Sequence, residues 1–258
     1  TEAPSWLRME LRMKILTIDL ETRPIAAYVW RLRDENIGIN QIIEPGGILS
    51  FAAKWHGRPG VEFACTWEDG EARMLRKAHK LLDEADAVIG WNSDRFDIRW
   101  LNGQFVKHGM ARPSPFAKVD LMKSVRYHTA LPSYKLDFVA QFLGVGGKIR
   151  TGGFDLWADL LNGCEKARTL MRRYNINDTK LTEKVFDRLR DKGWVRGLPN
   201  FAIEGGHCCP NCGGERLQAR GFTLSKTKRY QRFQCRDCGS WSQAVVCEPG
   251  GARIKAAA

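Results

Sequence analysis

Ile15-Leu16-Thr17-Ile18-Asp19-Leu20-Glu21-Thr22 is the stretch near the amino terminus from which the fold can be worked out. A short apolar run rich in β-branched residues predicts a central strand that is buried on both faces. Asp19 and Glu21 project from the same face of such a strand because side chains alternate along it. Two carboxylates there are costly unless a cation lies between them, and a divalent ion bound through oxygen is the simplest candidate. The alternative is a strand that ends in a polar turn with both side chains in water.

Two later segments add acidic side chains in similar positions. Val88-Ile89-Gly90-Trp91-Asn92 predicts a second buried strand, and residues 94–107 show helical spacing, which places Asp97 in the first turns of a helix. Tyr174 and Asp178 are four residues apart and lie on one face if residues 165–190 form a helix. Four carboxylates and a tyrosine can therefore converge on one site.

In order, spacing and context, these residues resemble the three motifs of the DEDD (DnaQ-like) superfamily of 3'-5' exonucleases, which has an RNase H-like fold. Asp19 with Glu21 resembles the first motif, Asp97 the second, and Tyr174 with Asp178 the third motif of the tyrosine-bearing subclass. The flanking residues are similar to the proofreading exonuclease domains of family-B DNA polymerases. Asn92 and Phe96-Asp97 resemble their Asn-Gly-x-x-Phe-Asp, with Ser93 in place of the glycine, and residues 133–144 resemble the segment between the second and third motifs. The resemblance covers roughly residues 13–191.

The resemblance implies a two-metal-ion 3'-5' exonuclease that releases nucleoside 5'-monophosphates. Asp19, Glu21 and Asp178 would hold one Mg²⁺ or Mn²⁺ ion, Asp19 would share a second, and Asp97 would help to place it through water. Tyr174, a neutral phenol at pH 7, would orient the nucleophile.

Three further residues are candidates to position the terminal nucleotides, namely Leu20, Asn92 and Phe96. DNA with single-stranded 3' ends is the favoured substrate, and RNA is the alternative because the chemistry does not require deoxyribose. A second alternative is a catalytically idle binding factor that works through the carboxy-terminal region. A polymerase or another replication or repair protein is an expected partner.

The other elements predict an α/β fold in which helices cover both faces of a mixed, RNase H-like sheet. Further strands are expected at residues 28–30, 48–53, 61–64 and 116–119, and helices at 71–84, 136–143, 154–161 and 165–190. Asp120 follows a strand, and we interpret it as the cap of a short helix rather than a metal ligand. Residues 144–153 predict a glycine-rich basic loop with Lys148 and Arg150, for which a plain surface loop is favoured over a phosphate contact.

Four cysteines predict a small second domain. Cys209-x-x-Cys212 and Cys235-x-x-Cys238 are each followed by glycine and are separated by 22 residues, which indicates one tetrahedral zinc ion in a zinc ribbon. The adjacent His207 and Cys208 leave the register of the first pair open. Disulfides or a redox pair are the alternative. The predicted organisation is an exonuclease domain at residues 1–192, a linker at 193–206 and a zinc ribbon at 207–258.

Between the cysteine pairs, basic and aromatic residues alternate, among them Arg229 and Tyr230. Such a hairpin can follow phosphates and stack on bases without reading sequence, which predicts contact with nucleic acid. The alternative is that the aromatic residues fill the core of a domain too small to fold without metal.

The formal net charge of +12 favours a polyanionic partner. No run approaches the ~20 apolar residues that a membrane span requires, and no charged-then-apolar leader is visible. We therefore expect a soluble protein of the cytoplasm with no membrane partner.

Overall fold

The computed structural model describes residues 13–33, 36–198, 207–225 and 227–248. A five-stranded sheet has the order β5-β4-β1-β6-β7, formed by Glu62–Cys65, Gly47–Trp55, Ile15–Arg23, Ala87–Gly90 and Ala117–Asp120. β1 is central, antiparallel to β4 and parallel to β6, and β6 is parallel to β7. The predicted mixed sheet built around residues 15–22 is therefore confirmed.

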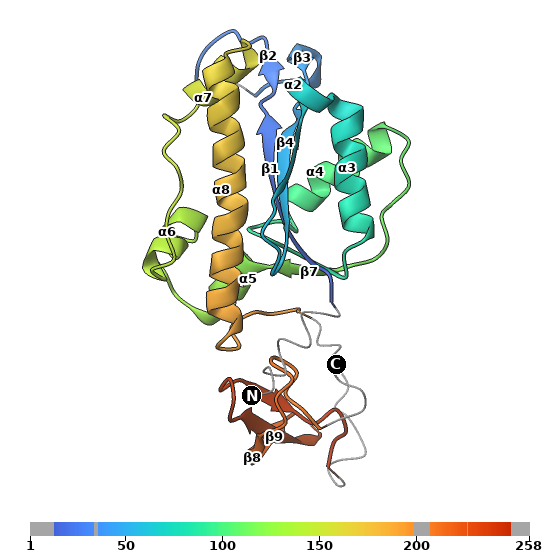
Figure 1. The fold of residues 1–258 in the computed structure, drawn as a ribbon, viewed down its shortest axis with the longest axis vertical. Helices are drawn as coiled ribbons and strands as arrows, with labels where there is room; N and C mark the ends of the chain where they lie inside the picture. The colour runs from blue at the N-terminus through green and yellow to red at the C-terminus, as the bar shows by residue number, and fades with distance from the viewer. Residues whose placement is uncertain (1–12, 34–35, 199–206, 226, 249–258) are drawn as a thin grey trace.

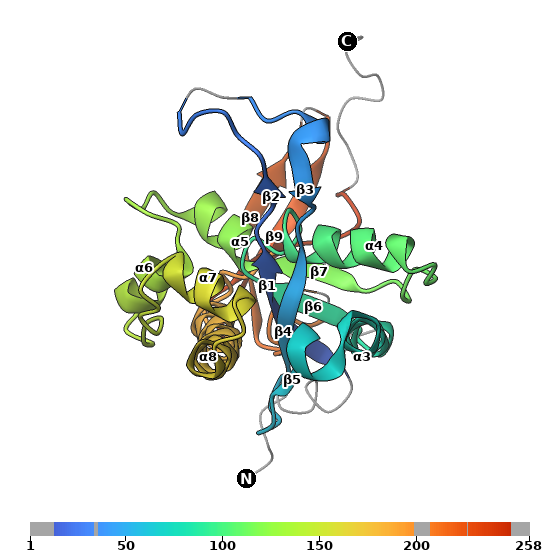
Figure 2. The same cartoon turned by 90° about the horizontal axis from the view of Figure 1, so that it is seen from above.

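Helices cover both faces of this sheet (Figure 2). α3 (Glu71–Asp83) and α4 (Asp97–Lys107) pack on one face, and α8 (Glu165–Arg190) packs along β1, β4 and β6 on the other. Leu16, Ile18 and Leu20 point toward α3 and α4, where they join one hydrophobic core cluster. Thr17, Asp19 and Glu21 are consequently directed to the opposite face, toward α8, because side chains alternate along a strand.

The remaining elements follow the predicted order with shifted ends. α2 (Thr66–Asp69) precedes α3, and α5 (Leu121–His128), α6 (Leu136–Phe142) and α7 (Asp155–Leu161) lead into α8. Asp120 caps α5 as predicted, because its Oδ1 accepts the backbone N–H of Lys123 at 3.3 Å. α4 begins at Asp97 instead of residue 94 because residues 93–96 form a turn.

The described residues between β1 and β4, 24–33 and 36–46, form an extension that the prediction described incorrectly. The expected strand at residues 28–30 is absent, and a short ladder forms instead between β2 (Ala26–Ala27) and β3 (Ile42–Glu44), before which lies the one-turn helix η1 (Ile39–Gln41). Tyr28 and Trp30 are 74% and 94% exposed, and neither belongs to a core cluster of the described residues, so the apolar run at residues 28–30 forms no buried strand.

The carboxy-terminal part contains a three-stranded antiparallel sheet, β8 (Leu217–Leu224), β9 (Arg229–Cys235) and β10 (Trp241–Gln243), in the order β10-β9-β8 (Figure 1). Asn211 Nδ2 donates to the carbonyl of Arg190, the last residue of α8, at 3.2 Å. The first part of the expected linker packs on the α/β body, since Val195 and Leu198 join its second core cluster. Residues 199–206, like the expected amino-terminal arm, lie outside the described residues, and the predicted domain boundaries stay predictions.

Candidate active site

The two carboxylates of β1 lie beside an irregularity in the sheet. Glu21 is paired with Ser50 but Thr22 is paired with Ile48, so Leu49 is an additional residue on β4. Such a bulge lets a strand change the direction of its side chains next to a site. Leu49 accordingly packs against α7 and α8 rather than in the core beneath α3.

Three of the four predicted carboxylates converge on one point. Oxygen atoms of Asp19, Glu21 and Asp178 all lie within 4.8 Å of one another. The fourth, Asp97, is 3% exposed, and its Oδ1 accepts the backbone N–H of Leu20 at 3.0 Å. Its charge is near enough to raise the pKa of Asp19. The structure therefore brings together three carboxylates from β1 and α8, and Asp97 of α4 contacts the β1 backbone beside them.

Asn175 holds Asp19 in place, a function the sequence analysis missed. Its Nδ2 donates to the Asp19 side chain at 2.7 Å and to the Asp19 carbonyl at 3.1 Å. Its Oδ1 accepts the hydroxyl of Ser50 at 3.0 Å, and Asn175 is fully buried. These bonds link α8 to β1 and β4 directly beneath the carboxylates. Because buried polar groups must be paired, this network fixes the orientation of Asp19.

Lys148 lies within the acidic cluster, which the sequence analysis also missed. Its Nζ donates to Asp178 Oδ2 at 2.5 Å and to Tyr174 Oη at 3.0 Å. Burial lowers the pKa of Lys148, but the charges of Asp178 and Tyr174 and the hydrogen bonds to both side chains together outweigh it, so the pKa is raised and the ammonium group stays charged. The glycine-rich loop that carries Lys148 is therefore not the plain surface loop we had favoured, because it places a cation among the carboxylates.

The carboxylates are strongly destabilised as anions. Burial and the charge of Asp178 raise the pKa of Glu21 to about 8, and burial raises the pKa of Asp97 to about 7. Burial, followed by the charges of Glu21, Asp97 and Asp178, raises the pKa of Asp19 well above its usual range. Lys148 alone does not compensate for these charges. Asp178 Oδ1 is also buried with no hydrogen-bond partner among the described residues. A hard divalent cation bound through oxygen would satisfy this atom and neutralise the cluster.

Tyr174 remains a neutral phenol in this environment. Burial is the largest cause that raises the pKa of Tyr174, to about 12, and the charge of Asp178 is the second, while Lys148 acts in the opposite direction. The ring packs edge to face against Trp157, with centroids 6.2 Å apart. The Lys148 ammonium donates to the phenol oxygen, so the phenol keeps its own proton as a hydrogen-bond donor.

A cleft of about 680 Å³ opens beside Asp19 and Lys148. It also contains Asn92, which the sequence analysis expected near the terminal nucleotides. Of the other two expected residues, Phe96 is 39% exposed and packs against Trp100, whereas the Leu20 side chain is buried in the core. This burial of Leu20 does not favour direct contact with nucleotides.

Cations and aromatic rings that were not singled out in the sequence also line this cleft. Arg126 lies 4.9 Å from the centroid of the Tyr134 ring, and Lys135 and Trp91 also line the cleft. These residues come from α5, the loop before α6 and the end of β6, so only the fold shows that they face Asp19.

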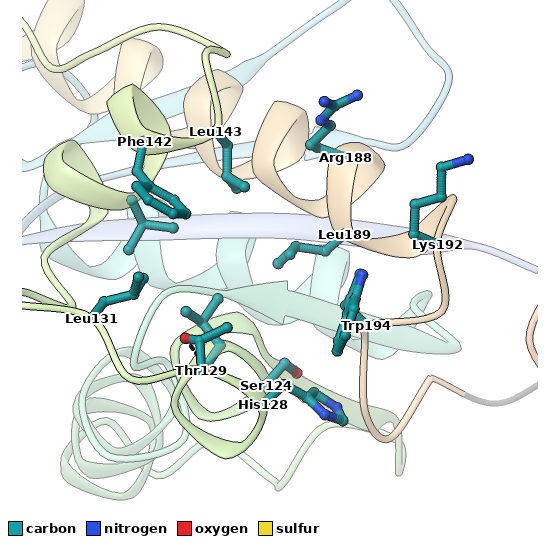
Figure 3. Close-up of a pocket in the computed structure, with 12 residues that line it drawn as sticks. Ser124, His128, Thr129, Leu131, Phe142, Leu143, Arg188, Leu189, Lys192 and Trp194 are labelled. Carbon is teal, nitrogen blue, oxygen red and sulfur yellow. Dashed lines mark hydrogen bonds between the residues drawn. The ribbon is translucent and has the colours of Figure 1, made fainter. Parts of the chain in front are cut away.

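A second, apolar cavity of about 280 Å³ lies between α5, α6 and the end of α8 (Figure 3). None of the described residues that line it is acidic, and none belongs to the carboxylate cluster: Ser124, Val125, His128, Thr129, Leu131, Val139, Phe142, Leu143, Arg188, Leu189, Lys192 and Trp194. We therefore place the chemistry in the first cleft.

The four predicted zinc ligands form a separate cluster. Four sulfur atoms lie within 4.8 Å of one another, those of Cys209, Cys212, Cys235 and Cys238. The Sγ–Sγ distance is 3.7 Å for Cys209–Cys238 and 3.6 Å for Cys212–Cys235. These distances exceed the ~2.05 Å of a disulfide bond. They fit a tetrahedral site with Zn–S bonds of ~2.3 Å, which places sulfurs ~3.8 Å apart.

The backbone around this cluster supports thiolate ligands. The N–H groups of Asn211 and Gly214 donate to the sulfurs of Cys209 and Cys212, each at 3.4 Å, and the N–H of Asp237 donates to Cys235 at 3.4 Å. Cys208 is not part of the cluster, which resolves the register of the first pair. The cysteine cluster fits the predicted zinc ribbon.

Comparisons with known proteins agree with this geometry. The structure resembles that of the family B DNA polymerase from the hyperthermophilic archaeon Pyrobaculum calidifontis, with a TM-score of 0.54 and 18% sequence identity, over 86% of this chain and 33% of the polymerase. The chain thus spans about a third of that protein's length, and the likeness lies in the fold. None of the curated proteins searched matches the chain.

A sequence model of the RNase H superfamily matches residues 53–190. The matched region exceeds half of the chain and includes Asp97, Tyr174 and Asp178, although it begins after β1. It confirms the RNase H-like fold expected from the sequence and favours nuclease chemistry. The chain belongs to the RNase H superfamily.

Proposed function

We propose that this protein is a metal-dependent 3'-5' exonuclease that shortens nucleic acid from single-stranded 3' ends, with DNA favoured, and releases nucleoside 5'-monophosphates. The observation that carries the proposal is the convergence of Asp19, Glu21 and Asp178 within 4.8 Å, with Tyr174 bonded to the same lysine as Asp178. Membership of the RNase H superfamily supports the nuclease class.

Two Mg²⁺ or Mn²⁺ ions suit this set of ligands. Asp19, Glu21 and Asp178 would hold the first ion, Asp19 would also hold the second, and Asp97 would help to place it through water. When bound, such a pair lowers the pKa of the attacking water and stabilises the leaving 3' oxygen. The raised pKa values of these carboxylates and the unsatisfied Asp178 Oδ1 support this assignment.

The protein's own polar groups would orient the reactants. Tyr174 keeps its proton, so its phenol would donate a hydrogen bond to position the attacking water or the scissile phosphate, and it would not act as a base. Lys148 stays charged and would contact a non-bridging phosphate oxygen or hold Tyr174 in place. Asn175 would keep Asp19 in the orientation needed for both ions.

The 680 Å³ cleft would receive the 3'-terminal strand. Arg126 and Lys135 would contact phosphates, and Trp91 and Tyr134 would stack on bases, since cations and aromatic rings together bind single strands without reading sequence. Asn92 lies in the same cleft, which supports its predicted contact with the last nucleotides, and Phe96, four residues later, is 39% exposed and so available for the contact predicted for it.

The test uses single-stranded DNA, duplex DNA and RNA, each labelled at the 5' end and incubated with Mg²⁺, with Mn²⁺ or without an added divalent ion. We expect a metal-dependent ladder of products shortened from the 3' end, strongest for single-stranded DNA. Asp19→Ala should abolish the ladder while the protein stays folded. A fully active Asp19→Ala variant would refute the assignment, stronger cleavage of RNA would identify an exoribonuclease, and binding without cleavage would identify a binding factor.

A further inference from the structure

The three-stranded sheet of the carboxy-terminal part has two chemically different faces. Residues alternate between the faces along β9, so Arg229, Gln231 and Phe233 share one face while Tyr230 and Arg232 share the other. Arg229 and Tyr230, which the sequence analysis grouped as one binding site, therefore point in opposite directions. At most one of them belongs to any single binding surface on this sheet.

The strand register assigns the neighbouring residues. Residues that pair directly across antiparallel strands share a face. We call one face the tryptophan face, and it consists of Gln218, Thr223, Tyr230, Arg232, Gln234, Trp241 and Gln243. We call the other the phenylalanine face, and it consists of Leu217, Ala219, Phe222, Leu224, Arg229, Gln231, Phe233, Cys235 and Ser242.

We propose that the tryptophan face binds unpaired bases of a single-stranded nucleic acid. Trp241 is 49% exposed, and the Arg232 guanidinium lies 4.8 Å from its ring centroid. The Arg232 side chain is held there because its Nε donates to the carbonyl of Arg220 at 3.0 Å. An ordered guanidinium and an exposed ring together offer a stacking platform beside a cation for phosphate.

The other side chains of this face suit the same ligand. Gln218, Gln234 and Gln243 offer amide donors and acceptors to base edges, and Tyr230 adds a second ring. β8, β9 and β10 contain no aspartate or glutamate, so no like charge repels a phosphate along the strands.

The phenylalanine face is less suited to this role. The Phe233 ring is packed against His207, with ring centroids 4.7 Å apart. The Gln231 amide already donates to the carbonyl of Gly221 at 2.9 Å and to that of Arg232 at 3.1 Å. Leu224, 75% exposed, adds an aliphatic surface without polar groups.

Because each face carries one aromatic ring under an arginine, the chain provides its own matched control. The variant Trp241→Ala/Arg232→Ala removes the pair on the tryptophan face, and Phe222→Ala/Arg229→Ala removes the pair on the other, where Arg229 lies 4.6 Å from the Phe222 centroid. Both variants lose one positive charge, so general attraction to phosphates falls equally. Any difference in affinity reports the loss of specific contacts.

The measurement is the fluorescence anisotropy of a labelled single-stranded oligonucleotide of about 16 nucleotides, the upper site size of a single-strand binding module. It uses the full chain without added divalent ions, and zinc content is checked by mass spectrometry. Loss of stacking on one base should weaken binding by the tryptophan-face variant roughly 5- to 150-fold relative to the phenylalanine-face variant. Equal affinities of the two variants, or a larger loss in the phenylalanine-face variant, would overturn the inference.

If either double variant loses zinc, single substitutions of Trp241 replace it in the binding test. Trp241→Phe keeps a ring and should retain most of the affinity, whereas Trp241→Leu should lose it; equal affinity of these two variants would overturn the inference.

This inference rests on the proposed function only for its choice of nucleic acid as ligand, and the two can fail separately. Metal-dependent cleavage with no dependence of binding on Trp241 would refute the binding face and leave the nuclease in place. Binding that depends on Trp241 without any cleavage would support the binding face and refute the proposed nuclease activity.

Discussion

The raised pKa of Glu21 leads to a prediction for the stability of the metal-free protein. The pKa of this carboxyl rises from 4.5 to about 8, first because burial disfavours the anion and then because Asp178 is nearby. The folded protein therefore binds the proton more tightly than the unfolded chain does. This contribution to stability is fully present below pH 4.5 and is lost as the pH rises through 8.

The size of the effect follows from the shift. A change from 4.5 to about 8 is about 3.5 units, or at most about 5 kcal/mol at 1.36 kcal/mol per unit. For a domain of this size, 1 kcal/mol corresponds to roughly 2–4 °C in melting temperature, so the loss is roughly 10–20 °C at most. Mg²⁺ or Mn²⁺ binds the deprotonated carboxylates, and its stabilising effect should therefore grow over the same pH range.

Thermal unfolding between pH 5 and pH 9, with and without Mg²⁺, measures both effects. Glu21→Gln keeps the size of the side chain and removes its charge, so it should make the metal-free curve less steep, with Asp19 and Asp97 still contributing, and it should reduce the stabilisation by Mg²⁺. Glu165→Gln is the control, because the Glu165 side chain is 80% exposed at the start of α8, and it should behave as the wild type. The reasoning fails if metal-free wild type keeps its melting temperature across this range, or if Glu21→Gln loses stability in the same way.

Four further substitutions separate the contributions of neighbouring residues. Lys148→Met should reduce the rate of cleavage about tenfold or more, because the site loses one positioned group. It should also lower the Mg²⁺ concentration needed to raise the melting temperature, because the variant lacks a cation that competes with Mg²⁺. An unchanged Mg²⁺ requirement would contradict the place of Lys148 in the carboxylate cluster. Asn175→Ala should lower the free energy of unfolding, measured in urea, by about 1–3 kcal/mol, since it leaves buried polar groups without partners. A smaller loss of stability would show that the hydrogen-bond network is dispensable. Asp97→Asn should abolish cleavage with no loss of metal-free stability, measured by gel assay and thermal unfolding. Cys238→Ser should eliminate bound zinc in mass spectrometry while cleavage of a short single strand continues, and one retained equivalent of zinc would disprove the four-cysteine site.

The sequence predicted the parts of the site that depend on local periodicity. Asp19 and Glu21 share a face because strands alternate, and Tyr174 lies next to Asp178 because helical side chains repeat every four residues. The convergence of these residues on one point depends on the tertiary fold. The strands and helices that bring them together could nevertheless be predicted, because strong hydrophobic patterns set their boundaries. The cysteine pairs were predictable for the same reason, because their spacing encodes the geometry of a zinc knuckle.

Lys148 and Asn175 were missed because their roles depend on contacts that are distant in the sequence. Lys148 sits in a loop without periodicity, and its contact with Asp178 spans 30 residues. Asn175 contacts Asp19 across 156 residues, and an asparagine inside a helix gives no local signal. The grouping of Arg229 with Tyr230 ignored the alternation of β9, which a confident strand assignment would have revealed.

None of the described helices is both long and apolar enough to span a bilayer. Basic residues line both proposed binding surfaces: Arg126 and Lys135 lie in the cleft, and Arg232 lies on the tryptophan face of the small sheet.

Anomalous diffraction from crystals grown with Mn²⁺ and a short single-stranded oligonucleotide would examine the carboxylate site most directly. We predict two Mn²⁺ peaks roughly 3.5–4 Å apart, the spacing of two-metal nucleases, with Asp19 bound to both and the 3' end of the strand beside them. A cluster with no manganese, or with ions bound elsewhere and Lys148 still paired to Asp178, would contradict the account.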